Sequence, residues 1–242
     1  MSGVQPSPTV WARPRRERPA LTVDRIVDEA VSLMDAEGLD ALTMRTLGAR
    51  LGAGATSMYR HVANREELLE LAVDRVYAEI EVPHCGRPET WRMALNASAH
   101  NMRSMVARHG WIAAALPAVG LYYLGPNVLR LNESLYCVLD IAGYPAAEID
   151  TAVSTLLGYV IGMSVAECAW LTKIARGDKS EQELLAELRP VVERAVAGYP
   201  KLSKTLALRG ESDIRAVRYV KFQYGLDRVL DGLQARLGGR VE

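Results

Sequence analysis

Little in this 242-residue sequence points to a membrane or to an oxidising compartment. No apolar run approaches the roughly 18 residues that a membrane span needs. The N-terminal residues also lack the apolar segment of a secretory signal. The three cysteines, Cys85, Cys137 and Cys168, are odd in number and widely spaced, so they predict neither a disulfide framework nor a metal-binding knuckle. We therefore expect a reduced, cytoplasmic protein that makes no contact with a membrane.

The motifs of common catalytic and metal sites are missing as well. There is no glycine-rich phosphate loop, no H-E-x-x-H motif and no G-x-S-x-G elbow. The paired Glu-x-x-His motifs of di-iron bundles are also absent. The four histidines, at positions 61, 84, 100 and 109, are scattered along the chain. We expect neither an enzyme nor a bound cofactor or metal.

Neither sign of charge is in excess. Lysine and arginine number 29, as do aspartate and glutamate, so the formal net charge is zero. The content of 49% hydrophobic and 24% charged residues is typical of a globular protein and excludes a disordered chain. Any nucleic-acid surface must therefore be a local patch.

Apolar residues recur at helical spacing, and β-branched runs with period two are absent. Thr22 is a predicted N-cap, Gly38 closes the first helix, and Asn64 opens another with a capping-box-like sequence. We find no internal repeat, so the sequence predicts an all-α protein. The predicted helices span residues 22–37, 43–51, 55–61, 64–80, 88–108, 111–116, 125–143, 146–175, 181–197 and 212–236.

Residues 1–20 differ in composition from the rest of the chain. They contain four prolines and four arginines but a single acid, so we expect a flexible arm. The arm is either a solvated tail or a basic segment that contacts phosphates or a minor groove. Its arginines are Arg13, Arg15, Arg16 and Arg18.

The stretch 41–65 contains four arginines and no acid, in a chain that is neutral overall. It covers two short helices joined by a glycine-containing turn, which is the shape of a helix-turn-helix. The second helix opens with the small residues Ala55, Thr56 and Ser57, which allow a helix N-terminus to approach DNA. This charge pattern predicts a surface that faces a DNA duplex. Met58 and Val62, four residues apart, are expected to anchor the second helix in the core.

Residues 42–69, LTMRTLGARLGAGATSMYRHVANREELL, resemble the DNA-binding signature of the TetR repressors. The resemblance implies a homodimer that binds a near-palindromic duplex operator and is released by a small-molecule effector. By position it makes Arg45 a candidate for a guanine contact and places Ala55 and Thr56 near bases. The implied phosphate contacts are Thr43, Ser57, Tyr59, His61 and Arg65, with Arg60 at a variable position.

Structural interpretations stand beside these roles. Tyr59 and His61 could serve local packing, and Arg50 is expected to form a surface ion pair. The functional alternatives are a transcriptional activator and an architectural DNA-binding protein without an effector. Since an architectural protein needs no long apolar C-terminal half, we expect a repressor, with an efflux or biosynthetic gene, or its own gene, as the target.

Two C-terminal islands, residues 125–130 and 222–233, resemble the tetracycline-repressor branch. The resemblance divides the chain into an arm (1–20), a DNA-binding domain (21–82) and a ligand-binding and dimerisation domain (83–242). It places the dimer contact on helices near 146–175 and 212–236. An apolar stripe supports this placement, although it could also belong to a core within one chain. The stripe consists of Phe222, Leu226, Val229, Leu233 and Leu237.

A cavity for a mostly hydrophobic effector is expected between the helices 88–108, 125–143 and 146–175. Tetracycline repressors bind the drug's magnesium through a later histidine, but this chain has none after His109, so a tetracycline–magnesium ligand is not expected. The candidate lining residues are His100, Asn101, Met102, Met105, Trp111, Asn127, Leu131, Leu135, Thr155, Tyr159 and Met163.

Overall fold

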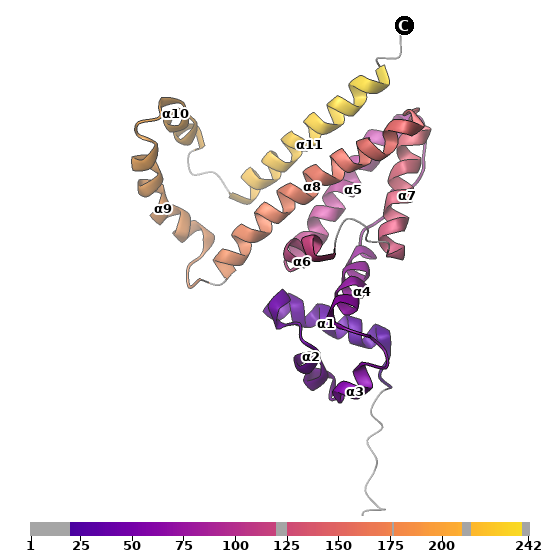
Figure 1. Cartoon of the computed structure of the whole chain (residues 1–242). Coiled ribbons are helices and arrows are strands. Elements are labelled where there is room, and N and C mark those ends of the chain that lie inside the picture. Colours follow the sequence, from indigo (N-terminus) through magenta and orange to yellow (C-terminus); the bar gives the residue numbers. More distant parts are fainter. Residues whose placement is uncertain (1–19, 120–124, 176, 210–213, 239–242) are drawn as a thin grey trace, which may run out of the picture.

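The computed structural model describes residues 20–119, 125–175, 177–209 and 214–238 and contains only helices and loops in these ranges (Figure 1). This confirms the predicted all-α fold. The α-helices are α1 (Val23–Glu37), α2 (Met44–Leu51), α3 (Ala55–Met58), α4 (Arg65–Tyr77), α5 (Trp91–Arg108), α6 (Ile112–Val119), α7 (Pro126–Ile141), α8 (Ala146–Ala175), α9 (Glu181–Val196), α10 (Pro200–Arg209) and α11 (Ile214–Gly238).

Side-chain caps set the starts of the first helices, as the sequence predicts. The Thr22 hydroxyl accepts a hydrogen bond from the Arg25 N–H at 3.2 Å, and α1 ends at Gly38 with φ of 86°. The Asn64 side chain accepts from the Glu67 N–H at 2.7 Å and opens α4. These bonds satisfy backbone N–H groups that a helix terminus leaves unpaired.

Helices α1 to α4 form an N-terminal domain around a small core. The side chains of Ile26, Leu47, Met58, Val62 and Leu68 are each 1% exposed or less. Met58 and Val62 therefore anchor α3 and the turn after it, as predicted. Burial of these residues fixes the orientation of α3 relative to α2.

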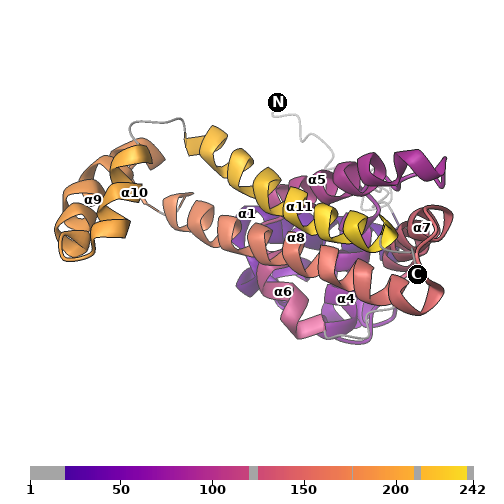
Figure 2. The ribbon, with the colours of Figure 1, turned by 90° about the horizontal axis from the view of Figure 1, so that it is seen from above.

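The C-terminal domain is built around the long helix α8. Helices α5, α7 and α11 pack against it, while α9 and α10 stand apart as a helical hairpin (Figures 1 and 2). Helix α9 has no buried residue. The base of this hairpin contacts the rest of the domain through Glu181. Its carboxylate pairs with Arg218 on α11 and accepts a hydrogen bond from Trp170 on α8.

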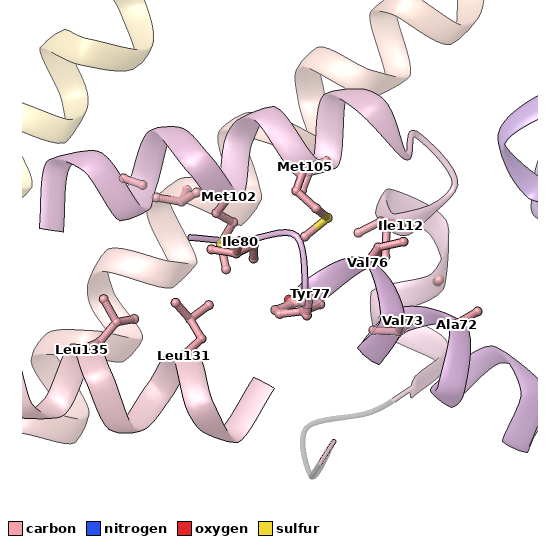
Figure 3. Packing of buried hydrophobic residues seen from close by; sticks show 14 of the residues in the cluster. Ala72, Val73, Val76, Tyr77, Ile80, Met102, Met105, Ile112, Leu131 and Leu135 are labelled. Carbon is pink, nitrogen blue, oxygen red and sulfur yellow. The ribbon is translucent and has the colours of Figure 1, made fainter. Parts of the chain in front are cut away.

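A continuous core joins the two domains. Val76, Tyr77 and Ile80 at the end of α4 are buried with Met105 of α5 and Ile112 of α6 (Figure 3). Helix α4 packs against both α6 and α7. The helix that carries the DNA-binding domain is thus part of the core of the larger domain.

The structure corrects the expectation about cysteines. Cys85 and Cys137 form a disulfide, with a Cα–Cα distance of 5.8 Å and a sequence separation of 52. Spacing alone could not predict this pair, because the fold lays the segment after α4 along α7. The third cysteine, Cys168, is free and buried.

The expectation that no apolar stretch approaches membrane-spanning length is wrong for α8. An 18-residue window of this helix has a mean hydropathy of 1.5, and 33% of the window is buried. By length and composition it could cross a membrane, but core helices meet the same criteria. Here α8 packs against α5, α7 and α11.

Two C-terminal predictions also change. Helix α10 was not predicted, because Pro200 was interpreted as a turn residue although proline is also common at the first position of a helix. The apolar stripe of α11 lies in the core of its own chain: Phe222 and Leu226 are 1% exposed or less and Leu233 is 8% exposed. This stripe therefore packs within the chain.

Candidate nucleic-acid interface and ligand cavity

The four arginines of the acid-free stretch have different surroundings. Arg50 pairs with Glu29 at 2.6 Å and Glu37 at 3.2 Å, which confirms the predicted surface ion pair. Arg65 donates hydrogen bonds to the carbonyl oxygens of Leu42 at 2.8 Å and Leu39 at 3.3 Å. The guanidinium groups of these two arginines are thus occupied by partners within the N-terminal domain.

Arg45 and Arg60 are exposed and have no ion-pair partner in the described part of the chain. Arg45 is on the first turn of α2 and Arg60 is in the turn that follows α3. Their guanidinium groups therefore supply the unneutralised positive charge of the helix-turn-helix. Such groups suit the phosphates and guanine edges of a duplex.

The remaining predicted DNA contacts lie around the same turn. The Thr43 hydroxyl caps α2, accepting from the Thr46 N–H at 3.1 Å. The side chains of Thr56 and Ser57 are exposed, Tyr59 is 53% exposed, and His61 is half-buried. Ala55 begins α3. The arm arginines, Arg13, Arg15, Arg16 and Arg18, lie outside the described residues.

Sequence reasoning missed the role of Gly48 in α2. A Cβ atom on this residue would lie 3.0 Å from the Ala53 carbonyl oxygen and 3.2 Å from the Met58 sulfur. Only glycine leaves enough room for the turn and α3 to pack this closely against α2. A glycine in the middle of a predicted helix is the sequence signal of such an approach.

A cavity of about 10 Å³ lies between α5, α7 and α8. Its predicted lining residues Met102, Leu131 and Leu135 face one another, as Figure 3 shows. The other lining residues, which the sequence analysis missed, are Ser98, Ala99, Leu156, Leu157 and Val160. The space is close to the minimum that one water molecule requires.

Ser98 is the polar residue of this apolar lining. It is 5% exposed, and its hydroxyl oxygen has no hydrogen-bond partner among the residues described. A buried hydroxyl without a partner costs free energy, so a polar atom of a ligand or a water that met it would be stabilised.

Several predicted ligand residues have partners elsewhere. His100 bonds to Gln223 at 2.7 Å, and the Tyr159 hydroxyl donates to the Phe222 carbonyl at 2.7 Å, so both side chains engage α11. Thr155 is exposed, and its hydroxyl donates to the Thr151 carbonyl oxygen. Asn101 and Met163 are half-buried, and Met105 is fully buried at the junction with α4.

Trp111 and Asn127 instead connect the two domains. The Trp111 indole N–H donates to Asp35 of α1 at 2.8 Å. The Asn127 side-chain amide and backbone N–H donate to Asp74 of α4 at 2.7 and 2.9 Å. The structure thus places part of the predicted ligand set at the cavity, part against α11 and part at the junction of the two domains, while Asn101, Thr155 and Met163 belong to none of these groups.

His109, at the end of α5, contacts two carboxylates of the N-terminal domain. Its ring nitrogens lie 2.8 Å from Asp35 and 3.0 Å from Glu79. Burial raises the pKa of Glu79, but hydrogen bonds from Arg108 and His109 outweigh it and hold the pKa below its ordinary value of 4.5. The junction cluster, as we use the term below, consists of Asp35, Glu79, Arg108, His109 and Trp111.

No group of three or more His, Cys, Asp or Glu side chains that could hold a metal ion occurs within the described ranges.

This arrangement defines a helix-turn-helix DNA-binding protein with a helical C-terminal domain that encloses a cavity. The family model "Bacterial regulatory proteins, tetR family" matches residues 26–72, and "Tetracyclin repressor-like, C-terminal domain" matches residues 84–237. The chain belongs to the TetR family of transcriptional regulators. Its relatives are named as transcriptional regulators and repressors, and none of these names describes an enzyme.

Relatives match over nearly the whole chain. An HTH-type transcriptional regulator of Saccharopolyspora erythraea is 35% identical, covering 95% of this chain and 92% of the relative. The transcriptional repressor DrrR1 of Streptomyces coeruleorubidus is 32% identical, with 94% and 83% covered. The crystal structure of ActR from Streptomyces coelicolor in complex with actinorhodin is similar with a TM-score of 0.77 at 28% identity, covering 92% of this chain and all of ActR.

Proposed function

We propose that the protein is a cytoplasmic homodimeric repressor that binds a near-palindromic duplex operator through α2 and α3 and leaves it when a small, mostly apolar ligand binds. This proposal rests on the different surroundings of the four arginines in residues 41–65. Two of them have partners within the N-terminal domain, and two are exposed without an ion-pair partner among the described residues. The guanidinium groups of Arg45 on α2 and Arg60 after α3 are available to DNA. Those of Arg50 and Arg65 bind carboxylate and carbonyl oxygens of the N-terminal domain.

The outer face of α8 supports the homodimer. Small exposed residues recur on this face about once per helical turn between positions 154 and 169, which permits close approach of a second helix. A Cβ added at Gly158 or Gly162 would meet no described atom within 4 Å. On α11, the side chains of Tyr219, Val220 and Tyr224 are 51–65% exposed. The small residues are Ser154, Gly158, Gly162, Ala166 and Ala169.

An arginine at Gly162 tests this interface. We expect Gly162→Arg to sediment as a monomer while its helical content stays that of the wild type, since the position faces open space in one chain. Glu133→Arg, an exposed change on α7, should remain dimeric. A Gly162→Arg protein that still sediments as a dimer would place the interface elsewhere.

The cavity supports ligand-induced release by a steric argument. Drug-sized ligands occupy roughly 300–1,000 Å³, whereas this cavity is about 10 Å³, so a ligand can enter only if the helices separate. Helix α7 supplies Leu131 and Leu135 to the cavity and also contacts α4. Movement of α7 therefore changes the position of the DNA-binding domain.

The related ActR binds actinorhodin, which makes this compound a suitable first probe. We expect it to bind and to release DNA, with an efflux or biosynthetic gene as the regulated target. Leu135→Trp should block binding by filling the cavity, while Leu129→Trp, on the exposed side of α7, should not. Equal binding by both variants would locate the ligand outside the cavity.

Selection from a random duplex pool tests the DNA-binding half of the proposal. The full chain should recover a site with two-fold symmetry whose half-site centres lie about 34–36 Å apart, one turn of DNA. Recovery of no consensus would favour an architectural protein, and a site without symmetry would contradict the dimeric mode of binding.

A further inference from the structure

The segment that follows α4 runs along one face of α7 and is joined to it by two hydrogen bonds and a disulfide. The Arg130 guanidinium donates to the Ile80 carbonyl at 3.5 Å, the Ser134 hydroxyl donates to the Pro83 carbonyl, and Cys137 is bonded to Cys85. Positions 130, 134 and 137 follow the helical i, i+4, i+7 spacing, so they share a face. We call residues 80–87 the strap.

The disulfide is the one covalent link between the strap and α7, and it is accessible. Cys85 is exposed and Cys137 is half-buried, whereas the free Cys168 is buried at 4% exposure. The Sγ of Cys168 lies 3.2 Å from the Val106 carbonyl oxygen, and burial raises the pKa of its thiol. Solvent-borne reagents can therefore reach the pair far more readily than Cys168.

A protein that binds the chromosome works in a reducing compartment, where disulfides are usually transient, catalytic or redox-sensing. A purely structural disulfide would be expected in an oxidising compartment instead. The accessible position of Cys85 and Cys137 is consistent with a bond that forms and breaks. The bond joins α7 to the strap, which directly follows α4, the helix that carries the DNA-binding domain.

We propose that Cys85 and Cys137 are a redox-active dithiol that takes hydroperoxides, and that its oxidation locks the strap on α7. The exposed Cys85 thiolate attacks the peroxide oxygen; the O–O bond breaks, leaving Cys85 as a sulfenic acid and releasing an alcohol, or water from hydrogen peroxide. The Cys137 thiolate then attacks the Cys85 sulfur, and the S–S bond forms as water leaves. Two molecules of a low-molecular-weight thiol restore both cysteine thiols by successive exchange through a mixed disulfide, and they leave as their own disulfide.

The consequence for DNA binding rests on the proposed function. A locked strap restricts the orientations of the DNA-binding domain before DNA is bound, so less conformational entropy is lost on binding. The oxidised protein should therefore bind its operator about fivefold more tightly than the reduced protein, the lower end of typical coupling between sites.

The first experiment is independent of DNA. The full chain, reduced with dithiothreitol and freed of it, is treated with hydrogen peroxide, and its remaining thiols are alkylated and located by mass spectrometry. We expect loss of alkylation at Cys85 and Cys137 alone, reversal by dithiothreitol, and slower hydrogen exchange in residues 80–87 after oxidation. In Cys137→Ser, peroxide should leave no intramolecular disulfide and no added protection of the strap.

Oxidation at Cys168 instead, or unchanged exchange in the strap, would overturn the redox site whatever the protein binds. The second experiment compares duplex affinity of oxidised and reduced wild type, with Cys168→Ser as a matched variant that should keep the difference. Equal affinities, or tighter binding by the reduced form, would overturn the proposed coupling. Loss of specific DNA binding in both forms would instead refute the proposed function and leave the redox result standing.

Discussion

At the scale of single residues, ion pairing separates arginines that could contact DNA from those that stabilise the domain. Arg45 and Arg50 are both exposed and lie five residues apart on α2, but Arg50 pairs with Glu29 and Glu37. The sequence pattern gives both the same charge and helix. The contacts of α1 with α2 confirm the surface ion pair expected for Arg50 and leave Arg45 without one among the described residues.

We predict that Arg45→Ala lowers specific DNA affinity by about 1–3 kcal/mol and relaxes preference at one base position. The reason is that its unpaired guanidinium is available for a guanine edge. Fluorescence anisotropy on operator variants measures both effects, with Arg50→Ala as the matched control. An equal loss on operator and random duplexes would remove Arg45 from base recognition.

A second residue prediction concerns Gly225 on α11. A Cβ at this position would overlap the Tyr159 ring, whose hydroxyl donates to the Phe222 carbonyl. Gly225→Ala should therefore destabilise the fold by about 1–3 kcal/mol through overpacking. Chemical unfolding would measure the loss.

Gly232 is the control for that prediction, because a Cβ there meets no described atom within 4 Å. In helix interiors, alanine is favoured over glycine by roughly 0.5–1 kcal/mol, so Gly232→Ala should be neutral or stabilising. If both variants lost the same stability, close packing of Tyr159 would not explain the first effect.

At the scale of elements, local sequence signals set most helix boundaries. Thr22, Gly38 and Asn64 act through bonds to neighbours in the chain, so sequence alone could predict them. Helix α10 was missed because Pro200 is compatible with both a turn and a helix start. The α11 stripe was predicted as a helix face, but periodicity does not say which helix covers it.

The N-terminus of α7 depends on a carboxylate supplied by another helix. Asp74 of α4 is 9% exposed and accepts hydrogen bonds from the Asn127 side chain and backbone. A carboxylate at a helix N-terminus also interacts favourably with the helix dipole.

We predict that Asp74→Ala lowers the free energy of unfolding by about 2–3 kcal/mol, since buried N–H groups lose a charged acceptor. Asp24→Ala serves as a control because Asp24 lies on the exposed surface of α1, where it pairs with Arg75. If Asp74→Ala and Asp24→Ala lowered the free energy of unfolding equally, the hydrogen bonds from Asn127 to Asp74 would contribute no more than an exposed ion pair.

The junction cluster predicts a pH dependence of stability. The pKa of Glu79 is lowered in the folded protein, so its interactions with Arg108 and His109 stabilise the fold above the ordinary value of 4.5. This contribution is lost as the pH falls through the lowered pKa. The free energy of unfolding of the wild type should therefore fall as the pH is lowered below 4.5.

Glu79→Gln removes this titrating group and is the comparison for that measurement. Its unfolding free energy should be lower than that of the wild type near neutral pH, and the two should converge in acid. If the difference between the two proteins stayed constant from neutral pH to acid, Glu79 would not be the source.

At the scale of the whole molecule, the DNA-binding domain is attached to two of the cavity-forming helices, α5 and α7. The junction cluster connects it to the end of α5, while Asp74 and the strap connect it to α7. A ligand that separates α7 from α5 would move these attachments relative to each other. A rotation of the DNA-binding domain is the expected result.

The candidate sites differ in how much of them sequence could predict. Apart from the arm arginines, the residues that we propose to contact DNA lie within residues 43–65, so a single local resemblance was enough to predict them. The cavity gathers residues from three helices between positions 98 and 160, and the sequence analysis found Met102, Leu131 and Leu135 but not Ser98. The Cys85–Cys137 pair and the junction cluster depend on contacts between distant segments, which periodicity does not reveal.

The central claim is sequence-specific binding of operator DNA by the helix-turn-helix. Its most direct measurement is the affinity of the full chain for the selected duplex and for a scrambled duplex of the same composition, by fluorescence anisotropy at physiological salt. We predict binding at least about a thousandfold tighter to the selected site, the lower end for specific recognition. Comparable affinities with the same steep salt dependence would contradict the claim, because they would show a protein that binds only the phosphate backbone.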